Sequence, residues 1–298
     1  MRRLCNEINT IASINFHICH RQKSLSPYHT AISELNDPLL CGRGHALIAL
    51  KKLVQCRNEE TMNHFDDVLR IAQEHLSQDD SYLYLSAINL CTELGSARTE
   101  VVLPVLLNEF SSCALMDPGT TEDDKVLPPK LRAEVTLNVG EALVQTCRLL
   151  GEVAPFHSEV MVNKFLQLFK AVSDEFIRSS VLTNLAEICS LMRYKINNCI
   201  QEILVLVTDV LNREPRNLIR QAAINLLRMI VERNRTDMLQ VFGDVMIDVY
   251  RIVKMCAFND RDETVRLHAT ICHEHISTNM KNIVDKEMSL CIRQVKIP

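Results

Sequence analysis

Histidine and cysteine near the start of the chain supply the residue types that bind zinc. The cluster is His17, Cys19 and His20, and Cys5 stands twelve positions before it. A structural zinc site needs four ligands, which usually come as two pairs at a recognisable spacing. No second pair stands at such a spacing here, so we predict no metal at this cluster.

A second group with metal-binding side chains lies near the end of the chain, around Cys272. His273 and His275 are two positions apart, so on a helix they point to different sides. His268 and Cys272 are four apart and share a helix face, but the apolar periodicity places Cys272 in the core. We therefore expect no metal and no cofactor at this group either.

Residues for enzymatic catalysis are hard to find in the sequence. A nucleophile, a base and an orienting group must come together, yet there is no Gly-x-Ser-x-Gly motif. Only 7 glycines are present, too few to suggest a glycine-rich phosphate loop. Glu141, directly after Gly140, is the most notable lone carboxylate, and it fits a contact with a neighbouring helix or with solvent better than catalysis. We expect no catalytic residue and no enzymatic activity.

Basic residues gather in one stretch and have two interpretations. Acidic residues interleave with them, which is typical of a solvated face; alternatively, the stretch is a patch for an acidic segment of a protein partner. A net charge of −4 and the lack of interleaved aromatic residues argue against nucleic-acid binding. The basic residues are Arg213, Arg216, Arg220, Arg228, Arg233 and Arg235.

Composition is that of a folded protein in a reducing compartment. Of 298 residues, 47% are hydrophobic and 23% are charged, which is ordinary for a soluble fold. The 12 cysteines are scattered, which favours buried thiols over a disulfide framework. The first 25 residues lack a signal-peptide pattern, and no apolar run is long enough to span a membrane. We expect a cytoplasmic protein.

A repeated pattern runs along most of the chain: an acidic or proline-bearing turn, then a basic or aromatic residue, then an apolar helix. The spacing is 41 from Arg43 to Tyr84, 42 from Arg178 to Arg220 and 46 from Arg220 to Arg266. HEAT-type repeats of two helices have a period of about 40–47 residues. A further repeat fits residues 131–150. The signature residues are Asp37, Arg43, Asp80, Tyr84, Asp174, Arg178, Arg220, Asp262 and Arg266.

This periodicity predicts an all-α, HEAT/armadillo-like α-solenoid of about six helical hairpins over residues 29–298. Residues 1–28 form a poorly defined segment, helical or flexible. Residues 111–130 are acidic and rich in proline, which predicts a loop insertion that either docks a partner or serves as a solvated spacer.

Each acidic residue before a second helix has a local structural reason. Its carboxylate accepts hydrogen bonds from free backbone N–H groups at the helix start, where negative charge is also favourable. Pro38 and Pro215 suit the first turn of a helix. The arginine a few residues later is expected to reach an aspartate of the adjacent repeat, so that a ladder of ion pairs supports the packing of the repeats.

Several blocks of sequence resemble one known family over about residues 32–276. The chain is similar to the C-terminal region of RNA polymerase II assembly and nuclear-transport factors, whose animal counterpart is named transport and Golgi organization protein six. The blocks are Leu35–Leu47, Asp79–Ile88, Val102–Leu107, Val139–Leu143, Leu150–Pro155 and Arg178–Leu185.

The resemblance implies a helical adaptor and two possible settings for it. One is the binding of RNA polymerase II subunits, chaperones and nuclear pore components; the other is protein secretion and Golgi organisation, where some family members are described as membrane proteins. Proteins of this family are longer than this chain. For a scaffold that binds partners with its second helices, we expect Arg43, His45, Asn184 and Arg220 to contact them.

Overall fold

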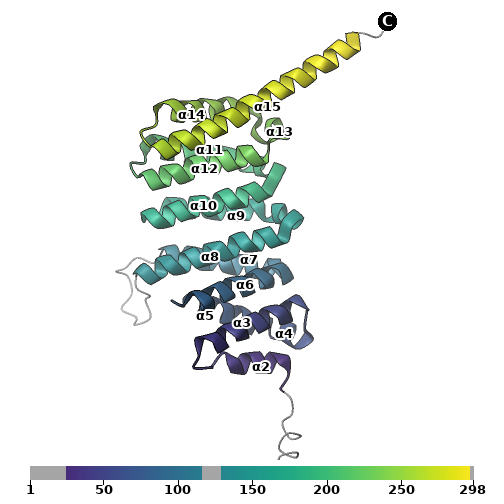
Figure 1. Ribbon diagram of the computed structural model, residues 1–298, viewed down its shortest axis with the longest axis vertical. Helices are drawn as coiled ribbons and strands as arrows, with labels where there is room; N and C mark the ends of the chain where they lie inside the picture. Colours follow the sequence, from purple (N-terminus) through teal and green to yellow (C-terminus); the bar gives the residue numbers. More distant parts are fainter. Residues whose placement is uncertain (1–24, 116–128, 296–298) are drawn as a thin grey trace, which may run out of the picture. The chain divides into compact units, whose positions relative to one another are not determined.

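Helices make up almost all of the chain that the structure describes. The computed structural model describes residues 25–115 and 129–295 (Figure 1), and no β-strand occurs in these two ranges. The predicted all-α fold is therefore confirmed. The described residues fall into two compact units, one up to Leu90 and one from Cys91, with the boundary inside one helix.

The first unit consists of helices of different lengths, from the five residues of α4 to the sixteen of α3. The helix over Phe65–Leu76 buries one face. Its buried residues recur in the sequence at steps of three and four: Phe65, Val68, Leu69, Ala72 and Leu76. The helices are α2 (Pro27–Glu34), α3 (Leu40–Gln55), α4 (Glu59–Asn63), α5 (Phe65–Leu76) and the first part of α6 (Ser81–Ala97).

The second unit contains four successive helical hairpins. The first helices are α7 (Thr99–Leu115), α9 (Ser158–Ala171), α11 (Ile200–Arg213) and α14 (Met246–Asn259). The second helices are α8 (Pro129–Leu150), α10 (Glu175–Met192), α12 (Asn217–Arg233) and α15 (Glu263–Val295). Short elements join them: η1 (Gly151–His157), η2 (Arg193–Asn198), α13 (Met238–Phe242) and η3 (Gly243–Val245).

These hairpins form two layers. In Figure 1 the second helices lie side by side in front of the first helices, and α8 packs against α10, α10 against α12, and α12 against α15. Burial of apolar side chains holds the layers together. Phe110 of α7 and Phe165 of α9, for example, are fully buried with ring centroids 4.8 Å apart.

A glycine lets two second helices approach closely. A Cβ atom added to Gly140 of α8 would lie 2.3 Å from Nδ2 of Asn184 on α10 and 3.1 Å from the Phe110 ring. Any larger residue would have to displace the Asn184 amide. The glycine therefore fixes the spacing of α8 and α10 and places Asn184 between them.

Some expected boundaries need correction. The helix predicted over 131–150 lies within α8, and both ends of the segment predicted as an insertion at 111–130 are helical, because α7 continues to Leu115 and α8 begins at Pro129. Residues 116–128 and 1–24 lie outside the described residues. The first helix of the last hairpin begins at Met246, and Phe242 before it belongs to α13. A single repeat domain over 29–298 stays a prediction.

Candidate functional site: the arginine ladder and the second-helix surface

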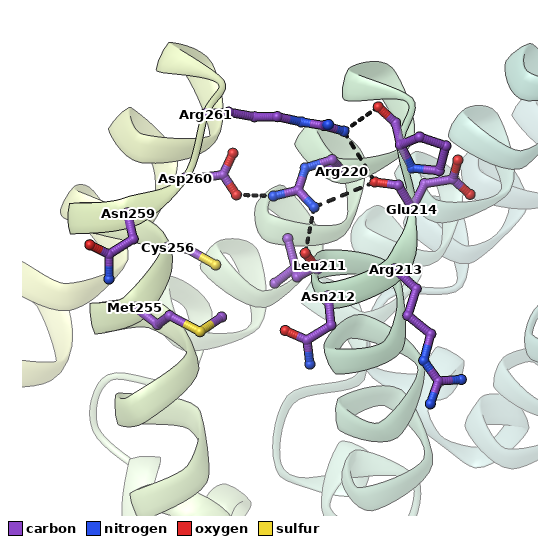
Figure 2. Close-up of a pocket in the computed structure, with 11 residues that line it drawn as sticks. Leu211, Asn212, Arg213, Glu214, Arg220, Met255, Cys256, Asn259, Asp260 and Arg261 are labelled. Carbon is purple, nitrogen blue, oxygen red and sulfur yellow. Dashed lines mark hydrogen bonds and ion pairs between the residues drawn. The ribbon is translucent and has the colours of Figure 1, made fainter.

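Arg220 is the centre of a buried ion-pair network between successive hairpins of the second unit. Figure 2 shows its guanidinium held between the carboxylate of Asp260 on one side and the backbone carbonyls of Leu211 and Glu214 on the other. The side chains of Arg220 and Asp260 are only 9% and 3% exposed. The predicted contact between an arginine and an aspartate of the next repeat is therefore present here.

Arg178 makes the same contact one hairpin earlier, with a glutamate in place of an aspartate. Its Nη1 lies 2.5 Å from Oε2 of Glu214, and Arg216 donates to Oε1 of the same carboxylate over 2.7 Å. Hydrogen bonds from Arg216 and from Arg178 lower the pKa of Glu214 to about 2, against a smaller opposing effect of burial. Arg178 also stacks 4.2 Å above the Phe169 ring.

The acidic residues of the repeat pattern have two distinct roles. Asp80, Asp174 and Asp262, four positions before the signature residue, cap the second helix; Ile177 N–H, for example, donates to Asp174 over 2.9 Å. Glu214 and Asp260, six positions before it, receive the arginine of the preceding hairpin. The expected pairing therefore involves Asp260 and not the predicted signature residue Asp262.

The prolines also differ from expectation. Pro38 and Pro215 precede the N-caps of α3 and α12, which are Leu39 and Arg216, so neither proline lies in a helical first turn. Each follows directly after an acid that stands six positions before an arginine, Asp37 or Glu214. The prolines therefore shape the turn between the two helices of a hairpin.

An open cavity of about 430 Å³ lies beside the ladder. Arg261 reaches across its rim and donates to the Glu214 and Pro215 carbonyls, and Met255 and Cys256 of α14 form the opposite wall (Figure 2). Burial raises the pKa of Cys256 to about 11, so its thiol is protonated at neutral pH. The polar groups of this cavity mostly bind one another, which makes it a structural joint.

The non-buried stripe of the second helices is more suited to binding. We define the second-helix surface by a row of charged residues on α8, α10, α12 and the turn after α12. Arg148 of α8 pairs with Glu187 of α10 over 3.0 Å, and Arg228 of α12 pairs with Glu232 over 2.8 Å. These pairs are half-exposed, so they hold their side chains loosely and can exchange partners. The second-helix surface comprises Glu141, Arg148, Glu187, Arg228, Glu232 and Arg235.

Two hollows interrupt this surface near the C-terminal ends of α10 and α12. One, of about 570 Å³, lies between Glu187 and Ser190 on α10 and Met229 and Glu232 on α12. The other, of about 530 Å³, extends to the 3₁₀ turn η1 and includes Arg193. Both are open and mixed in polarity, which is typical of a surface that contacts protein side chains.

The four residues expected to bind partners have different environments. His45 on α3 is exposed and packs edge-on against the Tyr82 ring, 6.2 Å away, while Arg43 is half-buried. Asn184 is half-buried beside Gly140, on the same face of α10 as Glu187. Arg220 is 7% exposed, which corrects its expected role: it supports the ladder and is not presented to a partner. Partner contacts by the other three stay predictions.

The arginines of the basic stretch do not form one patch. Arg213 pairs with Asp209 on the outer side of α11, Arg216 with Glu214 in the turn, and Arg228 with Glu232 on the second-helix surface. Arg235 donates to His275 over 2.8 Å. These partners favour the interpretation of a solvated, ion-paired surface over that of a single basic patch.

Histidine and cysteine of α15 lie in the packed layer. Cys272 is buried, and burial raises its pKa to about 12, so the thiolate that zinc requires is strongly disfavoured. Burial, with a smaller effect of Arg228, lowers the pKa of His268. Within the two described ranges, no group of three or more histidine, cysteine or acidic residues has metal-binding geometry.

One constellation was not predicted from the sequence. Ser26, His29 and Glu60 meet in the first unit, with Ser26 Oγ and Glu60 Oε1 each 2.9 Å from His29 Nδ1. A catalytic triad needs the serine and the acid on opposite ring nitrogens. Here both contact the same nitrogen, and the histidine side chain is 55% exposed. The arrangement caps α2 and does not activate the serine. Since it joins two helices, sequence spacing gives no signal for it.

Among the helices that the structure describes, none has the length and apolar character needed to span a membrane.

Comparisons with known proteins agree with this architecture. Residues 28–153 match the sequence model of a family described as "Required for nuclear transport of RNA pol II C-terminus 1". The protein "Transport and Golgi organization protein 6" of Drosophila melanogaster is 22% identical over 246 residues, which is 82% of this chain. The chain spans about a quarter (25%) of that relative's length. The resemblance inferred from the sequence is thus confirmed.

One solved structure supports the fold, and a second has a lower structural similarity. A Kap121p mutant superposes with a TM-score of 0.53 at 11% identity, covering 89% of this chain and 25% of that one. A designed armadillo repeat protein has a TM-score of 0.45 at 13% identity, covering 83% of this chain and 98% of that one. At these identities the likeness concerns the fold alone. The chain is a helical-repeat protein similar in sequence to nuclear-transport factors of RNA polymerase II and to a transport and Golgi organization protein.

Proposed function

We propose that this chain is a non-enzymatic scaffold that binds protein partners on its second-helix surface. The observation that carries the proposal is the contrast between the two networks. The ladder around Arg220 is buried and its charges pair within the chain, whereas the pair of Arg148 with Glu187, between α8 and α10, and the pair of Arg228 with Glu232, within α12, are half-exposed. Such pairs can be exchanged for charges of a partner without opening the core.

The geometry of the surface favours an elongated partner. The charged row crosses α8, α10 and α12, and the hollows beside Ser190 and Met229 leave room for side chains between the helices. Stacked second helices bind extended or helical segments in this way, because each repeat offers the same contacts to successive parts of the segment. We propose that Asn184, which is half-buried beside Gly140, hydrogen-bonds such a segment.

The partner that we propose is RNA polymerase II, on the basis of the family described for residues 28–153. The chain would then take part in the assembly or nuclear import of polymerase subunits, with chaperones and nuclear pore components as further partners, and would act in the cytoplasm and shuttle to the nucleus. A second candidate is a role in secretion and Golgi organisation, for which the name of the Drosophila relative is the support, because that similarity extends over 82% of the chain.

Affinity purification with surface variants tests both proposals. The chain carrying Arg148→Glu and Glu232→Lys reverses two exposed charges on different second helices, and we expect it to lose captured RNA polymerase II subunits at least tenfold, or about 1.4 kcal/mol. The matched control carries Arg251→Glu and Asp209→Lys, which reverse exposed charges on the first helices α14 and α11. Circular dichroism and urea unfolding check that both variants fold.

The pattern of loss separates the outcomes. Polymerase subunits captured equally by both variants would contradict binding on the second-helix surface. Capture of secretory-pathway proteins without polymerase, lost in the Arg148→Glu and Glu232→Lys variant alone, would replace the first candidate by the second. Capture of neither class would contradict both.

A further inference from the structure

One acidic position recurs at the turn of three hairpins. Glu214 and Asp260 stand six residues before Arg220 and Arg266, and Asp37 stands six residues before Arg43. Each of the three carboxylates accepts the backbone N–H two residues ahead, over 3.3, 3.0 and 2.8 Å respectively. The three turns therefore have the same local geometry, and we call these residues the ladder acids.

Two of the three ladder acids receive the preceding hairpin. Arg178 pairs with Glu214 and Arg220 pairs with Asp260. The residue after Arg220 makes a second contact in the same register, because Gln221 Nε2 donates to Asp262 Oδ1 over 3.1 Å. Arg220 and Gln221 thus contact two residues of the next hairpin, the ladder acid Asp260 and Asp262 two positions after it.

The third ladder acid, Asp37, has no such partner: no basic side chain of the described residues forms an ion pair with it. In the last hairpin, Arg266 Nη1 donates to the carbonyls of Asp260 and Arg261 over 2.8 and 3.2 Å, as Arg220 Nη1 donates to carbonyls of its own turn. No carboxylate within residues 25–115 or 129–282 accepts from Arg266. Among the described residues, Arg266 therefore has no ladder acid of a following hairpin, and Asp37 has no arginine of a preceding hairpin.

The neighbouring positions match as well. In the ladder register Leu267 corresponds to Gln221, and Leu39 corresponds to Asp262, the residue that Gln221 contacts. Leu267 is 57% exposed and Leu39 is 63% exposed. Leu267 and Leu39 thus take the positions that Gln221 and Asp262 have in the internal interface. A contact between these two surfaces would pair Arg266 with Asp37 and Leu267 with Leu39.

We propose that a second copy of this chain docks head-to-tail, with Arg266 of one copy on Asp37 of the next and Leu267 on Leu39. The interface would continue the internal ladder between α12 and α15. Because it joins two different surfaces, it is heterologous and leaves the same two ends free on the outer copies. Exposed Phe258 beside the arginine end and Leu40 beside the acid end would add apolar area.

The charge pair gives this contact its specificity. A wrong register would place an arginine or an acid against apolar surface without its partner, which costs more than the pair itself contributes. The leucines supply area without direction. We therefore expect the association to be concentration-dependent and to fail when either charge is reversed.

Light scattering coupled to size-exclusion chromatography tests the proposal with the whole chain. We expect the mean mass of the wild type to rise above that of one copy, 34.0 kDa, as the concentration is raised from about 1 μM toward 1 mM, the range in which weak contacts populate. Arg266→Glu alone and Asp37→Arg alone should each remain monomeric. An equimolar mixture of these two variants should associate again, since every contact between unlike copies then joins opposite charges.

Two further variants guard against trivial outcomes. Leu267→Lys should weaken association at least tenfold without touching either charge, while Arg251→Glu, an exposed change elsewhere on α14, should leave it as in the wild type. Urea unfolding verifies that each variant is folded. A wild type that stays monomeric throughout, an Arg266→Glu variant that still associates, or a mixture that does not regain association would each overturn the proposal.

Discussion

At the scale of single residues, burial decides which charges support the structure and which are available to a partner. Arg220 and Arg213 are both arginines of the same stretch of sequence, yet the side chain of one is 9% exposed and that of the other 82%. The buried residue pairs with Asp260 in a low-dielectric environment, and the exposed one pairs with Asp209 in water. Their substitutions should therefore have very different costs.

Arg220→Met should destabilise the chain by about 3–5 kcal/mol, because it leaves the Asp260 carboxylate buried without a counter-charge. Adding Asp260→Leu should recover much of that loss, since no buried charge then remains. Arg213→Met should cost no more than about 1 kcal/mol. Urea unfolding followed by circular dichroism gives these free energies of unfolding. Equal costs for Arg220→Met and Arg213→Met would contradict the buried ladder.

Glu214 should make the free energy of unfolding depend on pH in the acidic range. Its folded pKa is about 2 against an ordinary value of 4.5, so the unfolded chain takes up the proton first as the pH falls. The stabilisation is complete above pH 4.5 and is lost between pH 4.5 and 2. Glu214→Gln should reduce the slope of unfolding free energy in this window by up to about 1.4 kcal/mol per pH unit.

A second variant identifies the cause of that shift. Arg216→Met removes the hydrogen bonds that contribute most to the lowered pKa, so the loss of stability should still begin near pH 4.5 but end at a higher pH than in the wild type, and so span a narrower range. Unfolding curves measured across pH 2 to 6 give the comparison. A slope that is the same in all three proteins would exclude Glu214 as its source.

At the scale of elements, the helices were predictable and the joints were not. The stripe of α5 and the span of α8 follow from apolar residues at steps of three and four, a signal that each helix carries within itself. The joints depend on partners from other hairpins. Asp260 and Asp262 look alike in sequence, and only the position of Arg220 shows that the first receives an arginine while the second caps a helix.

The same limit explains what was missed at the candidate site. Arg220 stands at the position that recurs from repeat to repeat, and it is buried. A side chain that recurs in this way packs between repeats, so the repeat signal marks a structural residue. The second-helix surface follows no repeat pattern: Arg148 and Glu187 come from different helices, α8 and α10, which pack closely at Gly140. Such a cross-helix arrangement is not encoded in local spacing.

Arg193 lies at the junction of α10 and η2 in a backbone conformation that favours glycine. Its φ of 49° and ψ of −136° suit glycine, and Gly151, at the corresponding place after α8, has φ +52°. The ion pair of Arg193 with Glu152 is 62% and 78% exposed and contributes little. Arg193→Gly should therefore be more stable than Arg193→Ala by roughly 1–2 kcal/mol.

Thermal or urea unfolding of the two Arg193 variants measures this difference. Both lose the ion pair with Glu152, so alanine serves as the control for the side chain and the comparison isolates the backbone. In an ordinary helical position the order would be reversed, because glycine is the weaker helix former. An alanine variant that equals or exceeds the glycine variant would show that the joint is not strained.

At the scale of the whole molecule, the stacking of similar hairpins allows a buried network that repeats and an exposed surface that varies. Each hairpin of the second unit needs only its neighbours, so the buried ladder can be the same from repeat to repeat while the exposed stripe varies. The ladder gives the stack its register through Arg178 and Arg220. The stripe is then free to differ between α8, α10, α12 and α15, and in the proposed scaffold those differences would determine the choice of partner.

Hydrogen–deuterium exchange of the chain, free and bound to purified RNA polymerase II, tests the proposed scaffold most directly. We expect slower amide exchange on binding in α8, α10 and α12 and in the turn that carries Arg235, with little change in α9, α11 and α14, because the partner contacts the second-helix surface. Protection confined to the first helices, or exchange unchanged at a polymerase concentration that saturates a positive-control ligand, would contradict it.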